Sequence, residues 1–373
     1  MADPWFCEAD RVRIRRGVEE ILSGALSMGP NVRAFEHEFA RLVGVRHAIA
    51  MSSCTAALET ALGALGVSAG DEVIVPCETF IATGMAVHLA GGVPVFAEIS
   101  ESTFCLDLED VKARLSSRTR GIILVYMAGL IPPNILEFRK FCDDHGLFLI
   151  EDAAHAPGAR RGKVAGAFGQ AGCFSFFPTK VITAGEGGML TTDDDAVAEY
   201  ARSLRNRGID MNADVERYCL PGRNIRMTEM AALVGRVQLS HLTEYLEQRR
   251  RVAAIYRDEL GGNTEIRLIV PDDTHASSYW KVPALLPDGT DRSGVTKALK
   301  RAGIIVDWTY QPALHLQPVF RQIYATHEGL LPRSEQLLSR HICLPCHPRI
   351  SDDDARYVAT TLKAVLSSDR TTK

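Results

Sequence analysis

The sequence predicts an α/β fold in which a large domain with a mostly parallel central sheet is followed by a smaller C-terminal α/β domain. Between residues 47 and 192, short apolar strands alternate with helical stretches, as in parallel sheets covered on both faces. The chain has 373 residues, more than one hydrophobic core usually contains, and its pattern changes after a long helical stretch. We therefore expect a large domain at residues 1–248 and a small domain at residues 249–373.

The N-terminal part of the chain predicts two helices and then a strand. Apolar residues recur at helical spacing over residues 9–43, with an interruption at residues 28–31. Residues 47–51 form a short apolar run that predicts a strand. Residues 52–55 then open a helix at 56–62, because serine and threonine favour helix N-termini.

Strands and helices continue to alternate through the rest of the large domain. We expect strands at 72–76, 94–97, 119–125, 147–150, 173–177 and 188–192, with helices at 80–89, 108–115 and 134–145. Ligands of open α/β sheets bind beyond the carboxyl ends of the strands. Because Ser53, Asp152 and Lys180 all follow such ends, we expect them to share one site.

The C-terminal part of the chain begins with a long helical stretch at residues 229–256, which leads out of the large domain. Beyond it we expect strands near 278–285, 303–308 and 341–344, and helices near 293–301 and 352–366. This mixture predicts the smaller α/β domain.

Bulk properties exclude several classes of protein. The formal net charge is −4, which gives no basic footprint for nucleic acid. No apolar run approaches the ~20 residues that a membrane span needs. Residues 1–4 carry a charge and begin no apolar leader, so we expect a cytoplasmic location. The nine scattered cysteines are an odd number, which favours reduced thiols.

One cysteine pair has the spacing of a haem attachment site. Cys343 and Cys346 are followed by His347, as in c-type haem proteins, but that chemistry requires export. No second cysteine pair completes a zinc site. We expect no metal here, and instead a short buried strand that ends at Pro345 and Pro348.

Lys180 and Asp152 carry the strongest functional signal. Lys180 lies between the apolar run 174–177 and the glycine-rich run 184–188. Asp152 follows the four apolar residues 147–150 and Glu151, at a place where a carboxylate is costly to bury without a cation or donor; a salt bridge or a helix cap is the alternative. Pyridoxal phosphate (PLP) requires such a pair, because a lysine forms its Schiff base and an acid keeps its ring nitrogen protonated. The pair predicts an aminotransferase or a close relative.

Other residues near these strand ends could complete a cofactor site. The helix start at 52–55 favours an anion such as phosphate, although a plain N-cap also explains it, and Ser175 offers a second hydroxyl. Phe80 could stack on a planar ring or belong to the core. His155 could bind the phenolic oxygen of the ring or cover its face. Asn224 could meet a phosphate or cap the following helix.

Taken together, these segments resemble the DegT/DnrJ/StrS family of PLP-dependent sugar aminotransferases, over nearly the whole chain. The matching segments are Leu26–Val32, Ser52–Leu58, Glu78–Thr83, Glu151–Ala159, Phe174–Gly188, Arg223–Glu229, Leu314–Pro318 and Leu344–Pro348. The resemblance implies an aspartate-aminotransferase-like, fold-type I architecture. It also implies a homodimer with active sites at the subunit interface.

The resemblance assigns roles to individual residues. Lys180 matches the Schiff-base lysine, Asp152 the partner of the ring nitrogen and Phe80 the stacking aromatic. The remaining matches are His155 near the phenolic oxygen, Cys54, Thr55 and Ser175 in the phosphate cup, Asn224 from the neighbouring subunit, and His315 and Tyr310 on the substrate side. Two departures stand out: Cys54 replaces the usual glycine, and residues 126–130 replace a segment that usually carries a histidine and an aromatic residue.

The family further implies L-glutamate as amino donor and a nucleotide-linked keto sugar as acceptor. We expect a dTDP-4-keto-6-deoxyhexose, with amination at C4 favoured over C3 by family frequency. The alternatives are a cyclitol (keto-inositol) aminotransferase of aminoglycoside assembly, a PLP-dependent sugar dehydratase, and a non-enzymatic binding protein that kept the fold. Lys180 argues against the dehydratase, because the relevant relatives carry histidine at that position.

Overall fold

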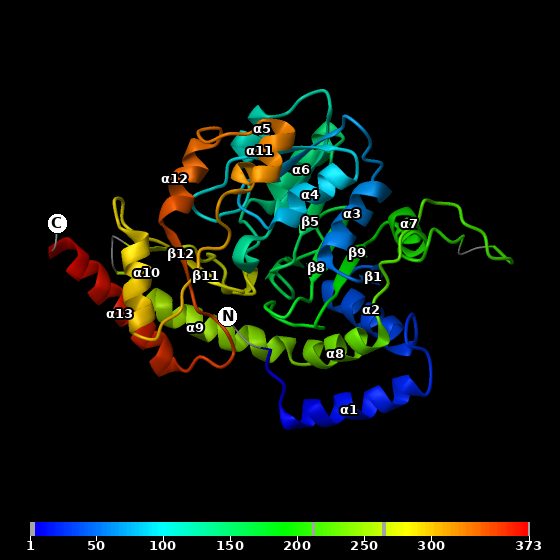
Figure 1. The fold of residues 1–373 in the computed structure, drawn as a ribbon, viewed down its shortest axis with the longest axis horizontal. Helices are drawn as coiled ribbons and strands as arrows, with labels where there is room; N and C mark the ends of the chain where they lie inside the picture. The colour runs from blue at the N-terminus through cyan, green and yellow to red at the C-terminus, as the bar shows by residue number, and fades with distance from the viewer. Residues whose placement is uncertain (1–3, 211–212, 263–265, 372–373) are drawn as a thin grey trace.

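A seven-stranded sheet forms the centre of the protein (Figure 1). The computed structural model describes residues 4–210, 213–262 and 266–371. Residues 1–3, which belong to the segment predicted to begin no apolar leader, lie outside the described residues. The strand order is β1-β9-β8-β5-β4-β2-β3. Within this sheet β9 runs antiparallel to both of its neighbours, and the other pairings are parallel. The predicted mostly parallel sheet is confirmed.

The strands of this sheet occupy the positions that the apolar runs predict. They are β1 (His47–Met51), β2 (Glu72–Pro76), β3 (Val93–Ala97), β4 (Thr119–Val125), β5 (Phe148–Asp152), β8 (Ala171–Ser175) and β9 (Gly188–Thr192). A small ribbon of β6 (Arg160–Arg161) and β7 (Lys163–Val164) follows β5. Most strand residues are buried, as expected for strands covered on both faces.

Helices cover the two faces of the sheet. They are α2 (Pro30–Val43), α3 (Cys54–Ala64), α4 (Ile81–Leu89), α5 (Leu108–Ala113), α6 (Ile135–His145) and α7 (Asp195–Arg205). Helix α7 was not predicted from the sequence, although Asp194 caps it by accepting from the N–H groups of Ala196 and Val197. The buried positions Val197, Ala201 and Leu204 follow a helical period that could have revealed it.

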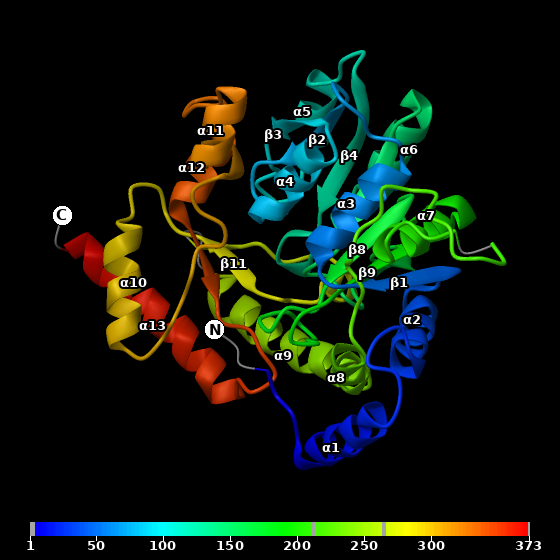
Figure 2. The same ribbon diagram turned by 45° about the vertical axis from the view of Figure 1, so that its right-hand side comes forward.

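The long helix expected at residues 229–256 is two helices, α8 (Glu229–Leu239) and α9 (Leu242–Leu260). Ser240 and His241 form a turn that separates the two helices. Helix α1 (Glu8–Leu22) packs against α8, as Figures 1 and 2 show. The proposed domain boundary between residues 248 and 249 falls inside α9, and it stays a proposal.

The C-terminal part contains a small antiparallel sheet packed against helices (Figure 2). Its elements are β10 (Arg267–Leu268), β11 (Val282–Leu285), β12 (His341–Leu344), α10 (Arg292–Arg301), α11 (Pro318–Tyr324), α12 (Pro332–Arg340) and α13 (Asp352–Thr371). A second hydrophobic core lies between α9, this sheet, α10 and α13.

The strand predicted at residues 303–308 is wrong. A single bridge joins Asp307 to Cys343, and Ile305 is exposed. The Thr309 hydroxyl donates to the Asp307 carboxylate at 2.7 Å, a local side-chain bond that competes with a ladder of backbone bonds. The apolar residues at 304–306 therefore do not form the strand that their pattern predicted.

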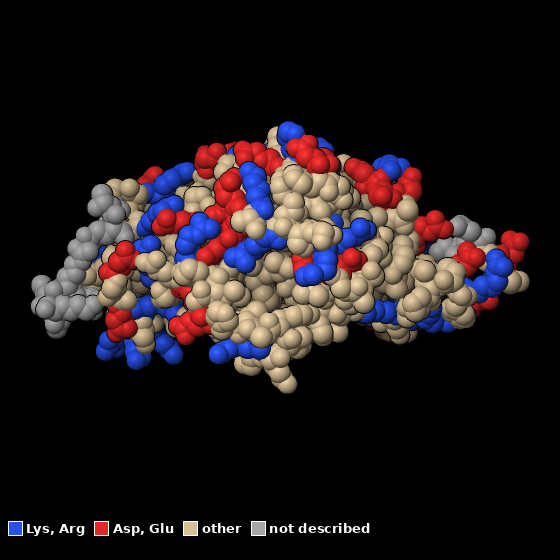
Figure 3. Space-filling view, turned by 90° about the horizontal axis from the view of Figure 1, so that it is seen from above, with Lys and Arg blue, Asp and Glu red and all other residues tan. Residues whose placement is uncertain are grey.

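The molecular surface mixes charges of both signs. On the face seen in Figure 3, acidic and basic side chains are interspersed around a broad uncharged region. Among the described residues, the structure contains no helix with both the length and the apolar character needed to cross a bilayer.

A buried carboxylate fixes the end of β5. Glu151 is fully buried and accepts hydrogen bonds from the Tyr126 hydroxyl and from the backbone N–H groups of Gly166, Phe168 and Gly169, at 2.6–2.7 Å. Burial raises the pKa of Glu151, and these four donors oppose the rise. The carboxylate thus ties the chain after β7 to the strand that ends in Asp152.

Replacing Glu151 by alanine should therefore destabilise the fold strongly. The variant leaves buried donors without an acceptor, so we expect a loss of about 3 kcal/mol or more in the free energy of unfolding. Tyr126→Phe removes one of the donors and should cost about 1–2 kcal/mol. Urea unfolding measures both, and the exposed Glu247→Ala is the control. A loss in Glu151→Ala no larger than in that control would contradict this account.

Candidate active site

Asp152 and Lys180 come together because β5 and β8 are parallel neighbours. Asp152 is the last residue of β5 and pairs with Cys173 in β8, and Lys180 follows the end of β8. The Asp152 carboxylate is 5% exposed and accepts from the Thr83 hydroxyl at 2.8 Å and from the Ala154 N–H at 3.2 Å. Burial raises the pKa of Asp152, while these donors and the charge of Lys180 oppose the rise.

The amine of Lys180 is held among apolar and aromatic groups. Its Nζ lies 4.5 Å from the centre of the Trp280 ring. Burial lowers the pKa of Lys180 to about 8, against the opposing charge of Asp152. A lysine with this pKa keeps a substantial neutral fraction near neutral pH, which a nucleophile or a base requires.

Two hydroxyl groups support Asp152, from Thr79 just before α4 and from Thr83 within it. The Thr79 and Thr83 hydroxyls lie 2.8 Å apart, and Thr83 donates to the carboxylate. Sequence reasoning gave Thr83 no role. Its position four residues after Thr79, one turn apart in the predicted helix, was the available signal.

His155 lies in an aromatic cluster beside Lys180. Its ring stacks on Trp280 with the ring centres 3.8 Å apart, and its Nε2 lies 3.2 Å from the Tyr310 hydroxyl. Burial, followed by the charge of Lys180, lowers the pKa of His155 well below its usual value, so the ring is neutral. Its Nδ1 is buried without a partner. Phe80, which is 53% exposed, lies 5.6 Å from Tyr310.

Two residues of the predicted phosphate cup, Cys54 and Thr55, lie at the start of α3. Ser53 caps this helix by accepting from Ala56, and Cys54 and Thr55 are its first residues, whose N–H groups lack helical partners. Gly188 packs against the backbone of Ser53 and Cys54 so closely that any side chain would overlap them. The glycine run thus allows β9 to approach this helix start.

The other residues of the predicted cup have different surroundings. Ser175 ends β8, five residues before Lys180, and is nearly buried. Burial, reinforced by the charge of Asp152, raises the pKa of Cys54 well above its usual value, so its thiol stays protonated. Asn224 is exposed, and its neighbour Ile225 accepts from the Ser52 N–H at 2.8 Å.

The structure does not place His315 with this group. Its ring is fully buried, its Nε2 lies 2.9 Å from the Glu335 carboxylate, and it packs 6.4 Å from the Phe96 ring. These contacts describe a histidine in the core, packed against β3 of the large sheet. Tyr310, the second residue expected on the substrate side, does lie within the aromatic cluster.

Sequence reasoning missed Trp280, Lys281 and Glu78. The Trp280 indole N–H donates to the Thr179 carbonyl at 2.6 Å, and its ring lies 4.5 Å from the Nζ atoms of both Lys180 and Lys281. Glu78 is fully buried, with one oxygen accepting from the Tyr310 N–H at 2.7 Å and the other without a partner. Long-range contacts create all three environments, so no local pattern reveals them.

The residues present fit pyridoxal phosphate. The buried Asp152 carboxylate has two neutral donors and can accept a further proton-bearing nitrogen. The unpartnered Nδ1 of His155 is a buried polar atom that a ligand oxygen would satisfy. Lys180 supplies an amine of lowered pKa, and the start of α3 suits a phosphate.

Comparisons with known proteins agree with this arrangement. Residues 9–363 match the DegT/DnrJ/EryC1/StrS aminotransferase family. The chain is 38% identical over 349 residues to GDP-perosamine synthase of Caulobacter vibrioides. The aligned region covers 91% of each protein.

Solved structures show the same fold. DesI, solved in the presence of its TDP-sugar product, matches with a TM-score of 0.87 and 34% identity, over 97% of this chain and 92% of that one. NtdA of Bacillus subtilis, with the bound cofactor PMP, matches with a TM-score of 0.88 and 26% identity, over 97% of this chain and 83% of that one. These matches confirm the predicted fold-type I architecture.

The buried Glu78 makes stability depend on pH. Burial raises the pKa of Glu78 to about 8, against opposing effects of the Tyr310 N–H and Lys281. Since the folded pKa is raised, the contribution of this group is full below the ordinary pKa of 4.5 and is lost as pH rises through about 8. Glu78→Gln keeps an acceptor for Tyr310 but cannot ionise. The stability of this variant relative to the parent protein should rise as pH increases from 4.5 to about 8, by at most about 1.4 kcal/mol per pH unit.

Thermal unfolding at several pH values measures this difference. The exposed Glu247→Gln, which lies away from the site, serves as the matched control and should follow the parent protein at every pH. A constant difference between Glu78→Gln and the parent would show that Glu78 does not titrate in this range.

Proposed function

Because the chain belongs to the DegT/DnrJ/EryC1/StrS aminotransferase family, we propose that it transfers an amino group from L-glutamate to a nucleotide-linked keto sugar in amino-sugar biosynthesis. Family membership confirms the resemblance seen in the sequence and identifies the protein as a PLP-dependent aminotransferase. The observation that carries the proposal is the meeting of Lys180 and Asp152 at neighbouring strand ends.

Each residue of the site has a defined task in this proposal. Bound PLP supplies an electron sink for the breaking of bonds at the substrate carbon. Lys180 would hold the cofactor covalently, and its freed amine would move a proton between the substrate carbon and the cofactor. Asp152 keeps the ring nitrogen protonated. His155 binds the phenolic oxygen, and Phe80 covers the ring.

The phosphate group of the cofactor is assigned to the start of α3. The N–H groups of Cys54 and Thr55, together with the helix dipole, favour an anion there, and the Ser175 hydroxyl adds a donor. Cysteine in place of glycine at position 54 leaves the N–H available, because this residue has ordinary helical geometry. Asn224 would approach the phosphate from a second subunit.

For the acceptor we propose a dTDP-4-keto-6-deoxyhexose aminated at C4. The TDP-sugar product of DesI supports this nucleotide. The name of the Caulobacter relative supports GDP as the competing nucleotide at similar identity. The aromatic cluster of Tyr310, Trp280 and His155 lies beside Lys180, so we assign the acceptor sugar to this side of the site.

A homodimer with shared sites completes the proposal. Asn224 is exposed on the chain between α7 and α8, part of which extends away from the sheet in Figure 1. Phe80 and Phe177 also expose large apolar rings, and Phe177 lies three residues before Lys180. Exposed apolar side chains are typical of surfaces that contact a partner. The cytoplasmic location stays a prediction.

Lys180→Ala should abolish both covalent cofactor binding and transamination. The parent holoenzyme should retain a pyridoxyl group on Lys180 after borohydride reduction, detected by peptide mass spectrometry, and the variant should not. With glutamate and a panel of dTDP-, GDP- and UDP-linked 3-keto and 4-keto sugars plus a keto-inositol, the parent should aminate the dTDP-4-keto sugar fastest. Turnover should fall by at least about 10⁴-fold in the variant, since the residue acts in the bond-breaking step itself.

The matched control is Lys140→Ala, since the Lys140 side chain is 74% exposed and pairs with Asp144 on the surface. It should keep both the adduct and the activity. Parental turnover in Lys180→Ala would overturn the catalytic assignment, whereas fastest turnover of a GDP sugar or of the keto-inositol would correct the acceptor alone.

Mixed dimers test the shared site. Lys180→Ala and Asn224→Asp should each be impaired, the latter because a carboxylate would repel the phosphate. When subunits of the two variants reassociate at random, about a quarter of all sites regain both native residues, so activity should return to about that fraction.

The control mixture combines Lys180→Ala with Asp152→Ala, two residues that come from the same subunit. Its mixed dimers contain no intact site and should stay inactive. Equal activity in the two mixtures would show that Asn224 serves the site of its own subunit.

A further inference from the structure

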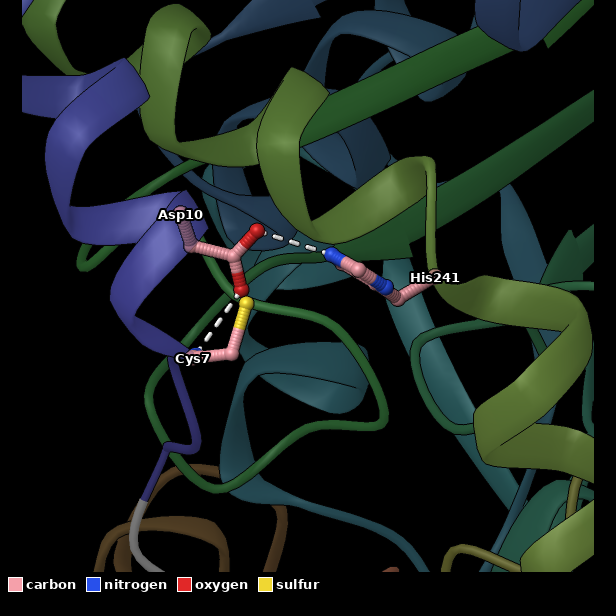
Figure 4. Close-up of side chains that lie close together, drawn as sticks. All are labelled: Cys7, Asp10 and His241. Carbon is pink, nitrogen blue, oxygen red and sulfur yellow. Dashed lines mark hydrogen bonds and ion pairs between the residues drawn. The ribbon is translucent and has the colours of Figure 1, made fainter.

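A group of three potential metal ligands lies where the N-terminal segment meets the junction of α8 and α9. Cys7 precedes α1, Asp10 lies in the first turn of α1, and His241 precedes α9, and Figure 4 shows their side chains pointing toward one another. One ligand atom of each lies within 4.8 Å of the other two. Asp10 is buried, whereas Cys7 and His241 are partly exposed, so solvent reaches the group from one side.

We propose that Cys7, Asp10 and His241 bind one zinc ion, with water as the fourth ligand. A thiolate, an imidazole and a carboxylate are the three donor types that zinc combines in proteins. Zinc–ligand distances of about 2.0–2.3 Å place tetrahedral donors ~3.4–3.7 Å apart, so small side-chain movements bring these three into position. On binding, the Cys7 thiol loses its proton to solvent, and His241 binds as neutral imidazole.

The surroundings of His241 support this assignment. Its Nε2 lies 2.8 Å from the Asp10 carboxylate, inside the group, while its Nδ1 faces the Glu244 carboxylate at 3.7 Å on the opposite side. Histidines that bind metal through one nitrogen usually present the other N–H to such an acceptor, which fixes the tautomer. The second oxygen of Asp10 accepts from the Cys7 N–H at 3.0 Å and so orients the carboxylate.

Helix capping and an ion pair explain part of the same geometry. Cys7 and Asp10 form a capping box at the start of α1, and Asp10 pairs with His241. Capping does not explain the thiol, because serine, threonine, asparagine and aspartate are the preferred caps and sulfur is a weak hydrogen-bonding atom. The zinc proposal accounts for the cysteine as well as for its two neighbours.

The ion would fasten a segment that lines a cavity together with Lys180. The Trp5 carbonyl accepts from Gln238 at 2.9 Å, and the Trp5 ring packs against Tyr245 with the centres 6.3 Å apart. Trp5, Tyr245 and Lys180 line one small cavity. A zinc ion two residues from Trp5 would therefore hold the chain that closes this cavity, and its effect should be on stability rather than on chemistry.

Metal binding to the chelator-treated holoenzyme tests the proposal. Cobalt(II) is the probe, because a tetrahedral site with a thiolate gives intense visible bands at wavelengths beyond the absorption of the cofactor. We expect one cobalt ion per chain, displacement by zinc, and a higher melting temperature with zinc than without it.

Cys7→Ser is the decisive variant, because serine caps a helix well and lacks the thiolate. It should keep the metal-free melting temperature of the parent but bind cobalt at least about 100-fold more weakly. His241→Asn should lose binding too, and Glu244→Gln should weaken it by about 10–100-fold. Cys219→Ser, at an exposed cysteine outside the group, is the matched control and should bind like the parent. Absence of the tetrahedral cobalt bands, or an unchanged cobalt affinity in Cys7→Ser, would overturn the zinc proposal. The group would then be explained by the capping box and the ion pair alone.

Discussion

Two consecutive carboxylates at the end of β5 determine how the rest of the site is built. Successive strand residues point to opposite faces, so Glu151 and Asp152 serve different purposes from one stretch of backbone. Glu151 faces the loop 166–169 and satisfies its N–H groups, whereas Asp152 faces Lys180. Burying both acids is costly, and each is supplied with donors of its own. The strand end is rigid for this reason, and Asp152 keeps its direction.

Desolvation is the main electrostatic influence on the site. It lowers the pKa values of Lys180 and His155, and it raises those of Asp152 and Glu78. Such an environment favours neutral amines and neutral imidazole, and it makes charge differences between neighbouring groups strong. A cationic ring nitrogen beside Asp152 would therefore gain more stabilisation here than in water, since the donors around the carboxylate are already oriented.

The sequence predicted the sheet and the meeting of Asp152 and Lys180, because both follow from local patterns and one topological rule. Apolar runs mark the strands, and parallel neighbours bring their carboxyl ends to one edge. It could not predict contacts between distant segments. Trp280 reaches Thr179 across about 100 positions, and nothing in the chain near residue 7 points to His241. The failed strand at 303–308 and the split at His241 have the same origin, since tertiary contacts and local side-chain bonds outweighed the apolar pattern.

The site draws on both parts of the chain, and a hydrogen bond to a buried carboxylate is among the contacts that join them. Asp152, Lys180 and the start of α3 come from the large sheet, whereas Trp280 and Tyr310 come from the C-terminal part. Glu78 connects the two by accepting from the Tyr310 backbone. Because that bond involves the main chain, the side chain of residue 310 is free to differ without disturbing the connection. Recognition of the acceptor can therefore change in the C-terminal part while the pair that performs the chemistry stays in place.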